Sequence, residues 1–409
     1  MLKPCITTLR ILAGTLLVYS WTASGALVIP GADGSDGAFS PTANTEIDLS
    51  QAPTAGWTTP GDGRGVYDPT KWAVVFKYSS VNIPAGVTVT FKNHDSRAAV
   101  VWLVSGDVTI AGTLSLKGQN WVSAPARAES GPGGYLGAVG YQSVTSPAGG
   151  GLGIGGGLPS SYGGSHATAG YLNTFPTYGN PRVLPLVGGS GGGGDFNGPY
   201  GGGGGGGALL LAVSGTLTVD GIISAQGGDG SSYGGSGSGA GGAVRLTAET
   251  IAGNGAVYAF GGQATYYGGD GRIRIETLNP AAAWAVVPVA TVAAPDNPVL
   301  LWLPAGAPTV EVLSVATEAV PPDPRARLDP GREDVSLPIL GGAADIQLQT
   351  NYVDPLATVQ VRITPEFGAP FFVNASFDSG DHEAATWIAT ATLPSGVFTV
   401  QAHAVNPAP

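Results

Sequence analysis

The chain contains 409 residues, of which 68 are glycine, 11% are charged and 43% are hydrophobic, and its net charge is −11. Disordered chains are poor in apolar residues and collagen needs glycine at every third position, so this composition and its glycine spacing exclude both classes. An acidic chain is also a poor ligand for nucleic acids and anionic lipids, because all three carry negative charge.

The first 26 residues have the pattern of a secretory signal. Lys3 and Arg10 supply positive charge before an apolar run over 11–18, and Ser24-Gly25-Ala26 forms a small-residue cleavage site. The run is shorter than the ~20 residues of a membrane-spanning helix, so we expect a secreted protein without membrane insertion after cleavage. Cys5 lies in this signal, so we expect a mature chain without disulfides or zinc–thiolate sites.

Residues 27–71 contain many turn signals and few strands, and we expect an extended segment that caps the domain after it. Asp33 and Asp36 lie in glycine-rich turns, where carboxylates suit a calcium ion. Two acids are too few for a complete calcium cage, and Asp-Gly pairs are ordinary turn residues. We therefore predict no cofactor, with calcium at Asp33 and Asp36 as the alternative.

The region 72–282 is built from repeats. Eight residues between Ala99 and Gly118 recur in identity between Ala208 and Gly227 at a constant offset of 109, and looser copies begin at Ala243 and Gly271. The last three copies begin 35 and 28 residues apart, and periods of this length are typical of a solenoid. The pieces between glycines are three to five apolar or β-branched residues long, which predicts a parallel β-helix with three strands per coil. Glycine would occupy corners where φ is positive or where backbones approach closely.

Glycine dominates residues 131–207, a composition that is also typical of a flexible linker. A second register favours order instead. The tripeptide Tyr-Gly-Gly begins at Tyr162, Tyr200, Tyr233 and Tyr267, with spacings of 38, 33 and 34 residues. These spacings match the coil period, so we expect the glycine loops to project from one corner of successive coils and to pack together. The tyrosines would then form a row that stacks on sugar rings, or they would only cover the glycine backbone.

The composition changes after the repeats. Residues 283–307 are rich in alanine, proline and valine and are predicted to be a linker. Residues 308–409 contain alternating strand patterns separated by turn signals, which predicts a small immunoglobulin-like β-sandwich.

The recurring pattern of Ser-Gly, an apolar-Thr-apolar triplet and a glycine-rich corner resembles secreted bacterial proteins of the right-handed parallel β-helix superfamily. That superfamily includes filamentous-haemagglutinin-like adhesins, pectate-lyase-like enzymes and glycine-rich surface proteins, often with appended β-sandwich modules. The resemblance covers about residues 72–278 and implies an all-β architecture. It leaves the function open, because the superfamily hosts both adhesion and polysaccharide cleavage.

Charge gathers on the predicted strands at one place, formed by Arg245, Glu249, Arg274 and Glu276. Aligning Val244 with Ile273 places Arg245 beside Arg274, and Glu276 beside Thr247. The polysaccharide-cleaving enzymes of the superfamily combine carboxylates with a basic residue on adjacent coils, and paired carboxylates supply the acid and base of glycoside hydrolysis. The alternative is a salt-bridge ladder on a solvated face.

We therefore expect a non-catalytic structural or adhesive protein of the cell surface or extracellular matrix, with extracellular polysaccharide or other surface proteins as partners. A carbohydrate-active protein is the alternative. It would bind polysaccharide through the tyrosine row or cleave it as a lyase or hydrolase.

Overall fold

The chain folds almost entirely into β-strands. The computed structural model describes residues 26–326, 328, 331–337 and 342–405, and residues 1–25 of the predicted signal, with Cys5, lie outside them. A single short 3-10 helix, η1 (Leu49–Gln51), occurs in this described part of the chain. No helix among the described residues is long and apolar enough to cross a membrane.

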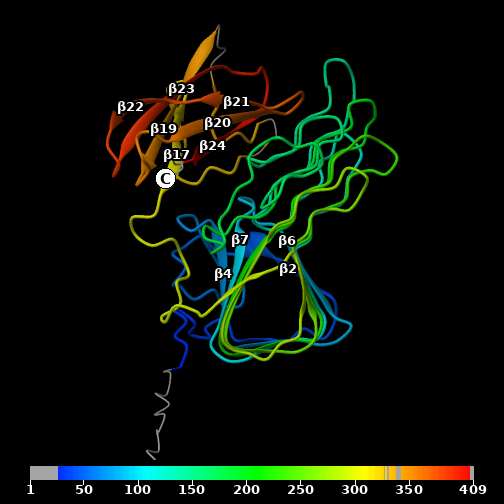
Figure 1. Cartoon of the computed structure of the whole chain (residues 1–409), viewed down its shortest axis with the longest axis vertical. Helices are drawn as coiled ribbons and strands as arrows, with labels where there is room; N and C mark the ends of the chain where they lie inside the picture. The colour runs from blue at the N-terminus through cyan, green and yellow to red at the C-terminus, as the bar shows by residue number, and fades with distance from the viewer. Residues whose placement is uncertain (1–25, 327, 329–330, 338–341, 406–409) are drawn as a thin grey trace, which may run out of the picture.

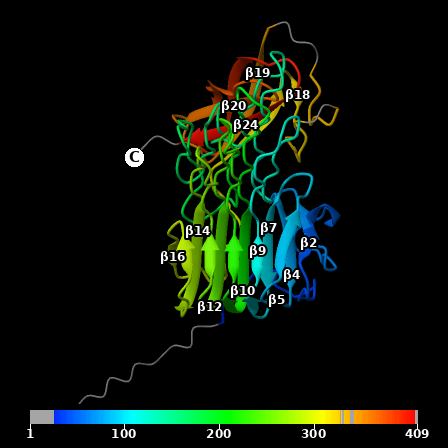
Figure 2. The ribbon, with the colours of Figure 1, turned by 90° about the vertical axis from the view of Figure 1, so that its right-hand side faces the viewer.

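Two sheets, which we call A and B, form a stack of strands (Figures 1 and 2). In the described chain, sheet A contains β1 (Ala38–Phe39), β3 (Val66–Asp68), β4 (Ala73–Tyr78), β5 (Ser80–Ile83), β7 (Ala99–Val104), β8 (Val108–Ile110), β10 (Ala208–Val219), β12 (Ala243–Ala252), β14 (Arg272–Pro280) and β16 (Thr291–Ala293). Sheet B contains β2 (Thr45–Asp48), β6 (Thr88–Lys92), β9 (Thr113–Ser115), β11 (Ile222–Ser224), β13 (Ala256–Tyr258) and β15 (Ala285–Val287). From β4 onward the chain passes repeatedly from sheet A to sheet B and back, with two strands of sheet A before β6 and before β9 and one strand thereafter. Each strand pairs in parallel with its counterpart in the next repeat.

The predicted repeats are confirmed by the backbone pairing. Val100 pairs with Leu209, and Thr113 pairs with Ile222, both at the offset of 109 residues seen in the sequence. Ala208 pairs with Ala243 at the offset of 35. Equivalent residues therefore lie directly above one another in the stack, because parallel pairing aligns strands that have the same pattern.

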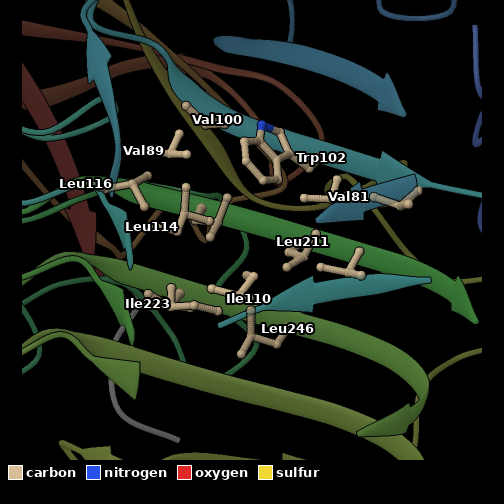
Figure 3. Close-up of a cluster of buried hydrophobic side chains, with 14 of the residues drawn as sticks. Val81, Val89, Val100, Trp102, Ile110, Leu114, Leu116, Leu211, Ile223 and Leu246 are labelled. Carbon is tan, nitrogen blue, oxygen red and sulfur yellow. The ribbon is translucent and has the colours of Figure 1, made fainter. Parts of the chain in front are cut away.

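The core of the stack lies between sheets A and B. Trp102 and Leu211 from sheet A meet Leu114 and Ile223 from sheet B, and all four side chains are fully buried (Figure 3). Alternate residues of each strand point inward, because successive side chains of a strand point to opposite faces. Full burial of one such side chain contributes about 2 kcal/mol.

The segment 283–307, expected to be a linker, contributes strands to the stack. β15 pairs with β13 and β16 pairs with β14, so one further repeat follows the region 72–282. The predicted capping segment 27–71 likewise supplies β1 and β2, which pair with β5 and β6. Strands of two to four residues carry too little periodicity to be recognised in the sequence, and their pairing with a longer neighbour stabilises them.

The glycine-rich segments between the strands pack on one another beside the stack, in an arrangement that we call the glycine bundle (Figure 1). All seven glycines of residues 201–207 are buried, and all seven N–H groups donate to backbone carbonyls of other segments. The acceptors belong to three segments, 116–122, 135–138 and 237–240, which alternate in strict rotation along the run. Every third N–H group therefore points toward the same neighbouring segment. Three residues per turn is the geometry of a polyproline II helix, which forms no hydrogen bonds within itself. The tract is therefore hydrogen-bonded and is not a free linker.

Close backbone approach explains why these positions are glycine. A Cβ atom would lie 1.8 Å from the Gly189 carbonyl oxygen if added at Gly205, and 2.0 Å from the Glu129 carbonyl oxygen if added at Gly204. Positive φ, the other reason that the sequence suggested for glycine, applies to none of residues 201–207. The prediction that the loops pack together is confirmed, and the cause is contact between backbones.

The C-terminal part, which we call the antiparallel unit, contains two further sheets, C and D. Within the described residues sheet C contains β18 (Glu318–Ala319), β17 (Thr309–Val315), β19 (Ala343–Asn351), β23 (Ala385–Thr392) and β22 (Ser376–Gly380), and sheet D contains β21 (Phe371–Asn374), β20 (Thr358–Pro365) and β24 (Phe398–Val405). Ile346 and Trp387 from sheet C share a buried core with Val361 and Ile363 from sheet D. The unit lies beside the glycine bundle (Figure 1).

Candidate functional site

The predicted charge cluster forms on the outer face of sheet A. Arg245 pairs with Arg274, and Thr247 with Glu276, in the register that the sequence predicted. The Arg245 Nε and Nη2 atoms donate to Glu276 Oε2 at 3.2 and 2.8 Å, and Thr247 Oγ1 donates to the same oxygen at 2.8 Å. The Arg274 Nε atom donates to Glu276 Oε1 at 3.0 Å. The cluster is therefore one carboxylate held by three side chains from two neighbouring strands.

This cluster is buried. The side chains of Arg245 and Glu276 are only 2% and 4% exposed. The segment that follows β16 crosses this face, and the Leu300 carbonyl accepts a hydrogen bond from Arg245 Nη1 at 2.7 Å. Burial by itself would raise the pKa of Glu276, but the charge of Arg245 and the hydrogen bonds from Arg245, Thr247 and Arg274 outweigh it, so this pKa lies below its usual value.

Glu249, the fourth predicted member, lies apart from the other three. It is half-buried near the end of β12, and its backbone carbonyl accepts a hydrogen bond from Thr277. No hydrogen bond or ion pair of the described residues joins its carboxylate to Arg245 or Arg274. The cluster therefore holds a single carboxylate, whereas glycoside hydrolysis uses two.

The four predicted tyrosines lie in loops of the glycine bundle but have different surroundings. Tyr233 is 84% and Tyr267 is 50% exposed, while Tyr162 and Tyr200 are half-buried. No ring contact among the described residues joins two of the four. The ring of Tyr200 packs on Trp121 at 5.2 Å between centroids, and the ring of Tyr267 packs on Tyr171 at 5.6 Å.

The loops that carry the four predicted tyrosines and Trp121, which we call the distal loops, are residues 119–127, 158–163, 195–200, 231–236 and 263–267. Hydrogen bonds join them: Ser161 N donates to the Gly235 carbonyl, and Ala124 N donates to the Pro199 carbonyl at 2.7 Å. Phe196, another distal-loop residue, is 55% exposed. Sequence reasoning missed Trp121, Tyr171 and Phe196, because these rings do not follow the Tyr-Gly-Gly period.

The carboxylates of Asp33 and Asp36 are engaged by donors of the protein. Asp33 accepts the Ser35 N–H at 2.9 Å and lies 3.6 Å from Lys77 Nζ. Asp36 accepts the backbone N–H groups of Gly63 at 2.7 Å and Lys77 at 2.6 Å. No group of three or more potential metal ligands occurs within the described residues. Asp33 therefore faces the ammonium of the buried Lys77, and Asp36 binds the backbone N–H of the same residue.

Two other buried groups connect distant parts of the chain. His166 Nδ1 donates a hydrogen bond to the Gly241 carbonyl at 2.8 Å, and burial lowers the pKa of His166 to about 4. Arg362 of β20 donates to the carbonyls of Gly153 and Gly156 in the glycine bundle, and burial lowers its pKa to about 9. Both residues have structural partners, and the sequence analysis assigned them no role.

Two cavities of the described structure hold none of the predicted charged residues. A shallow groove of about 540 Å³ crosses the repeats near Thr113, Asp220 and Asn254. A cavity of about 1010 Å³ in the antiparallel unit is lined mainly by apolar residues of β17 and β24 and by residues within 320–326 and 333–337. Neither cavity combines paired carboxylates with a base.

No protein-family model, curated protein or solved structure matches this chain. A function can therefore be inferred only from its own residues and their arrangement.

Proposed function

We propose that this chain is a secreted, non-catalytic structural or adhesive protein of the bacterial cell surface or extracellular matrix. The observation that carries this proposal is the glycine bundle. Every N–H group of residues 201–207 is hydrogen-bonded to another segment, so the loops are held at fixed positions. Binding surfaces on loops that a rigid scaffold positions are common in recognition proteins.

We infer that sheets A and B belong to a right-handed parallel β-helix. The alternation of the chain between two parallel sheets supports this fold, and crossover connections between parallel strands are right-handed in about 98% of cases. The resemblance to β-helix surface proteins supports the same fold. The two antiparallel sheets and their shared core support an immunoglobulin-like β-sandwich for the antiparallel unit.

The charge cluster favours a structural role over catalysis. Glu276 accepts hydrogen bonds from three side chains and is buried under the segment after β16, so its oxygens are occupied. A general acid or base must come within hydrogen-bond distance of a substrate proton. The Glu276 carboxylate is instead hydrogen-bonded to donors of the protein itself.

The experiment that tests the proposal is a screen of the predicted mature chain, residues 27–409, against polysaccharides and surface proteins for both binding and cleavage. We expect binding to at least one of them without new reducing ends or unsaturated sugars. Cleavage that disappears in a Glu276→Gln variant with unchanged circular dichroism would replace the structural proposal with the enzymatic one.

Polysaccharide binding through aromatic rings is a second candidate function, favoured by the exposure of Tyr233 and Tyr267. Exposed rings contribute about 1 kcal/mol each by stacking. Tyr233→Ala and Tyr267→Ala should therefore each weaken retention on a bound polysaccharide about fivefold without changing the unfolding temperature. The control is Val144→Ala, since Val144 is 88% exposed and not aromatic. Equal retention of the tyrosine variants and the wild type would remove this candidate.

A further inference from the structure

The last repeat of the strand stack forms an edge without charge. No Asp, Glu, Lys or Arg occurs between Glu276 and Asp296, and this segment contains β15 and β16. β16 lies at one end of the stack (Figure 2). Proteins usually protect an edge strand with charged side chains, proline or a covering segment.

Backbone groups are unpaired along this edge. Within the described chain β15 pairs only with β13, and β16 pairs only with β14. The outward N–H and C=O groups of both strands are therefore a template for a further strand. The segment after β16 does not cover them, because Val299 and Leu301 pack on the outer face of sheet A.

Apolar side chains are exposed at the same edge. Val289 is 92%, Val292 64% and Val287 44% exposed. Trp284 and Val286 pack against the core of the stack but remain partly exposed, since no further repeat covers them. The core therefore ends in an apolar surface that contact with another molecule would bury.

The opposite end of the stack is protected. The outer side of β3 is covered, because Tyr67 N donates to the Pro53 carbonyl at 2.9 Å and the Tyr67 carbonyl accepts from Ala55 N at 3.0 Å. β2 carries Glu46 and Asp48, and Lys92 Nζ lies 2.8 Å from the Asp48 carboxylate. A charged and covered end is a poor partner for an uncharged edge, which disfavours head-to-tail assembly.

We propose that the edge formed by β15 and β16 is an interface with a second copy of this chain, related by a two-fold axis. An axis perpendicular to both sheets places each edge strand antiparallel to its own copy, so β16 pairs with β16 and β15 with β15. Such an isologous contact is closed and yields a dimer. The absence of charge suits it, because a charge near the axis would face its own copy. This inference rests on the strand pairing and does not depend on the proposed function.

The test is the mass of the predicted mature chain in solution, measured by light scattering and sedimentation at about 1 to 100 μM, a range that covers weak and stable dimers. We expect twice the chain mass. Val289→Lys and Val292→Lys should each weaken the dimer at least tenfold, because two copies of the new charge meet at the interface. Val289 lies between β15 and β16, so its variant leaves both strands intact.

Val144→Lys is the matched control, since Val144 is 88% exposed and lies outside the strand stack. It should dimerise as the wild type does, and all variants should keep the wild-type circular dichroism. A wild-type chain that is monomeric over the whole range would overturn the inference. A dimer that both edge variants leave unchanged would overturn it equally.

Discussion

At the scale of the residue, the packing of the glycine bundle requires residues that have no Cβ atom. The seven glycines of residues 201–207 are all buried, and the space that a side chain would need is filled by backbone of neighbouring segments. A backbone oxygen cannot rotate away as a flexible side chain does. One methyl group therefore forces whole segments apart, and the hydrogen bonds between them must lengthen.

We predict that Gly205→Ala lowers the free energy of unfolding by about 3 kcal/mol, the upper end of the usual cost of overpacking, because its Cβ would lie 1.8 Å from the Gly189 carbonyl oxygen. The measurement is urea unfolding followed by circular dichroism. Gly56→Ala is the control, since nothing lies within 4 Å of a Cβ at Gly56 and its φ is not positive. A loss below about 1 kcal/mol in Gly205→Ala would show that the bundle tolerates a side chain.

We predict that acid destabilises the protein in part through His166. Burial lowers its folded pKa to about 4, whereas the unfolded side chain titrates near 6.5. The unfolded state therefore binds the proton first as the pH falls, so stability is complete above pH 6.5 and is lost between pH 6.5 and 4. This loss amounts to about 2 kcal/mol between pH 7 and pH 5.

The measurement is urea unfolding at both pH values. His166→Asn should be less stable at pH 7 but should lose about 2 kcal/mol less on acidification. The variant should retain some pH dependence, because burial lowers the pKa of His403 as well. His382→Asn, at an exposed loop, is the control. Equal pH dependence in His166→Asn and the wild type would contradict the prediction.

At the scale of the element, the charge cluster joins β12 to β14. Glu276 lies between Arg245 and Arg274, which are paired neighbours, so the carboxylate neutralises two cations that would otherwise repel. Removing one partner of a buried ion pair leaves an uncompensated buried charge. The cost is far larger than for a pair at the surface.

We predict that Glu276→Gln lowers the free energy of unfolding by about 3 to 5 kcal/mol, because it leaves Arg245 and Arg274 without a counter-charge. Thermal and urea unfolding measure the loss. Lys92→Ala breaks an exposed ion pair with Asp48 and should change stability little. Equal effects of the two substitutions would mean that the buried cluster does not stabilise the stack.

At the scale of the whole molecule, the antiparallel unit docks on the glycine bundle. Arg362 donates to the Gly153 and Gly156 carbonyls, and the Arg362 guanidinium lies 5.3 Å from the Phe175 ring centroid. Phe372 packs edge-on against the same ring at 5.0 Å. Arg362 and Phe372 therefore both contact Phe175, and Arg127 Nη2 adds a hydrogen bond across the contact to the Glu366 carbonyl.

We predict that Phe372→Ala weakens this docking by about 1 kcal/mol, the strength of an aromatic pair. The Gly368 amide, which donates to the Ala148 carbonyl at 3.1 Å across the contact, should then exchange its hydrogen about fivefold faster. Phe377→Ala is the control, since Phe377 packs on Trp387 within the antiparallel unit. Unchanged exchange at Gly368 in Phe372→Ala would show that the contact between Phe372 and Phe175 does not hold the two parts together.

The sequence by itself determined the strand pairing of the repeats. Val100 pairs with Leu209 at the offset of 109 read from the chain, because parallel pairing stacks each residue on its counterpart in the next repeat. Val244 pairs with Ile273 as the sequence alignment placed them, one residue more than the spacing of 28 between the two copy starts. The sequence also placed Arg245 beside Arg274. It did not reveal β15 and β16, because strands of three residues have no period of their own.

The tertiary structure alone decided the environment of each candidate residue. Glu276 is buried because a segment from beyond β16 crosses it, and Tyr200 is half-buried because the Trp121 ring and the loop at Gly234 pack on it. The N–H groups of residues 201–207 donate to carbonyls in the three distant segments 116–122, 135–138 and 237–240. No pattern within the glycine run itself identifies these acceptors. The repeat spacing in the sequence determines which strand residues pair, because each repeat pairs with the repeat that follows it. Burial depends on distant segments that share no period with the strands they cover.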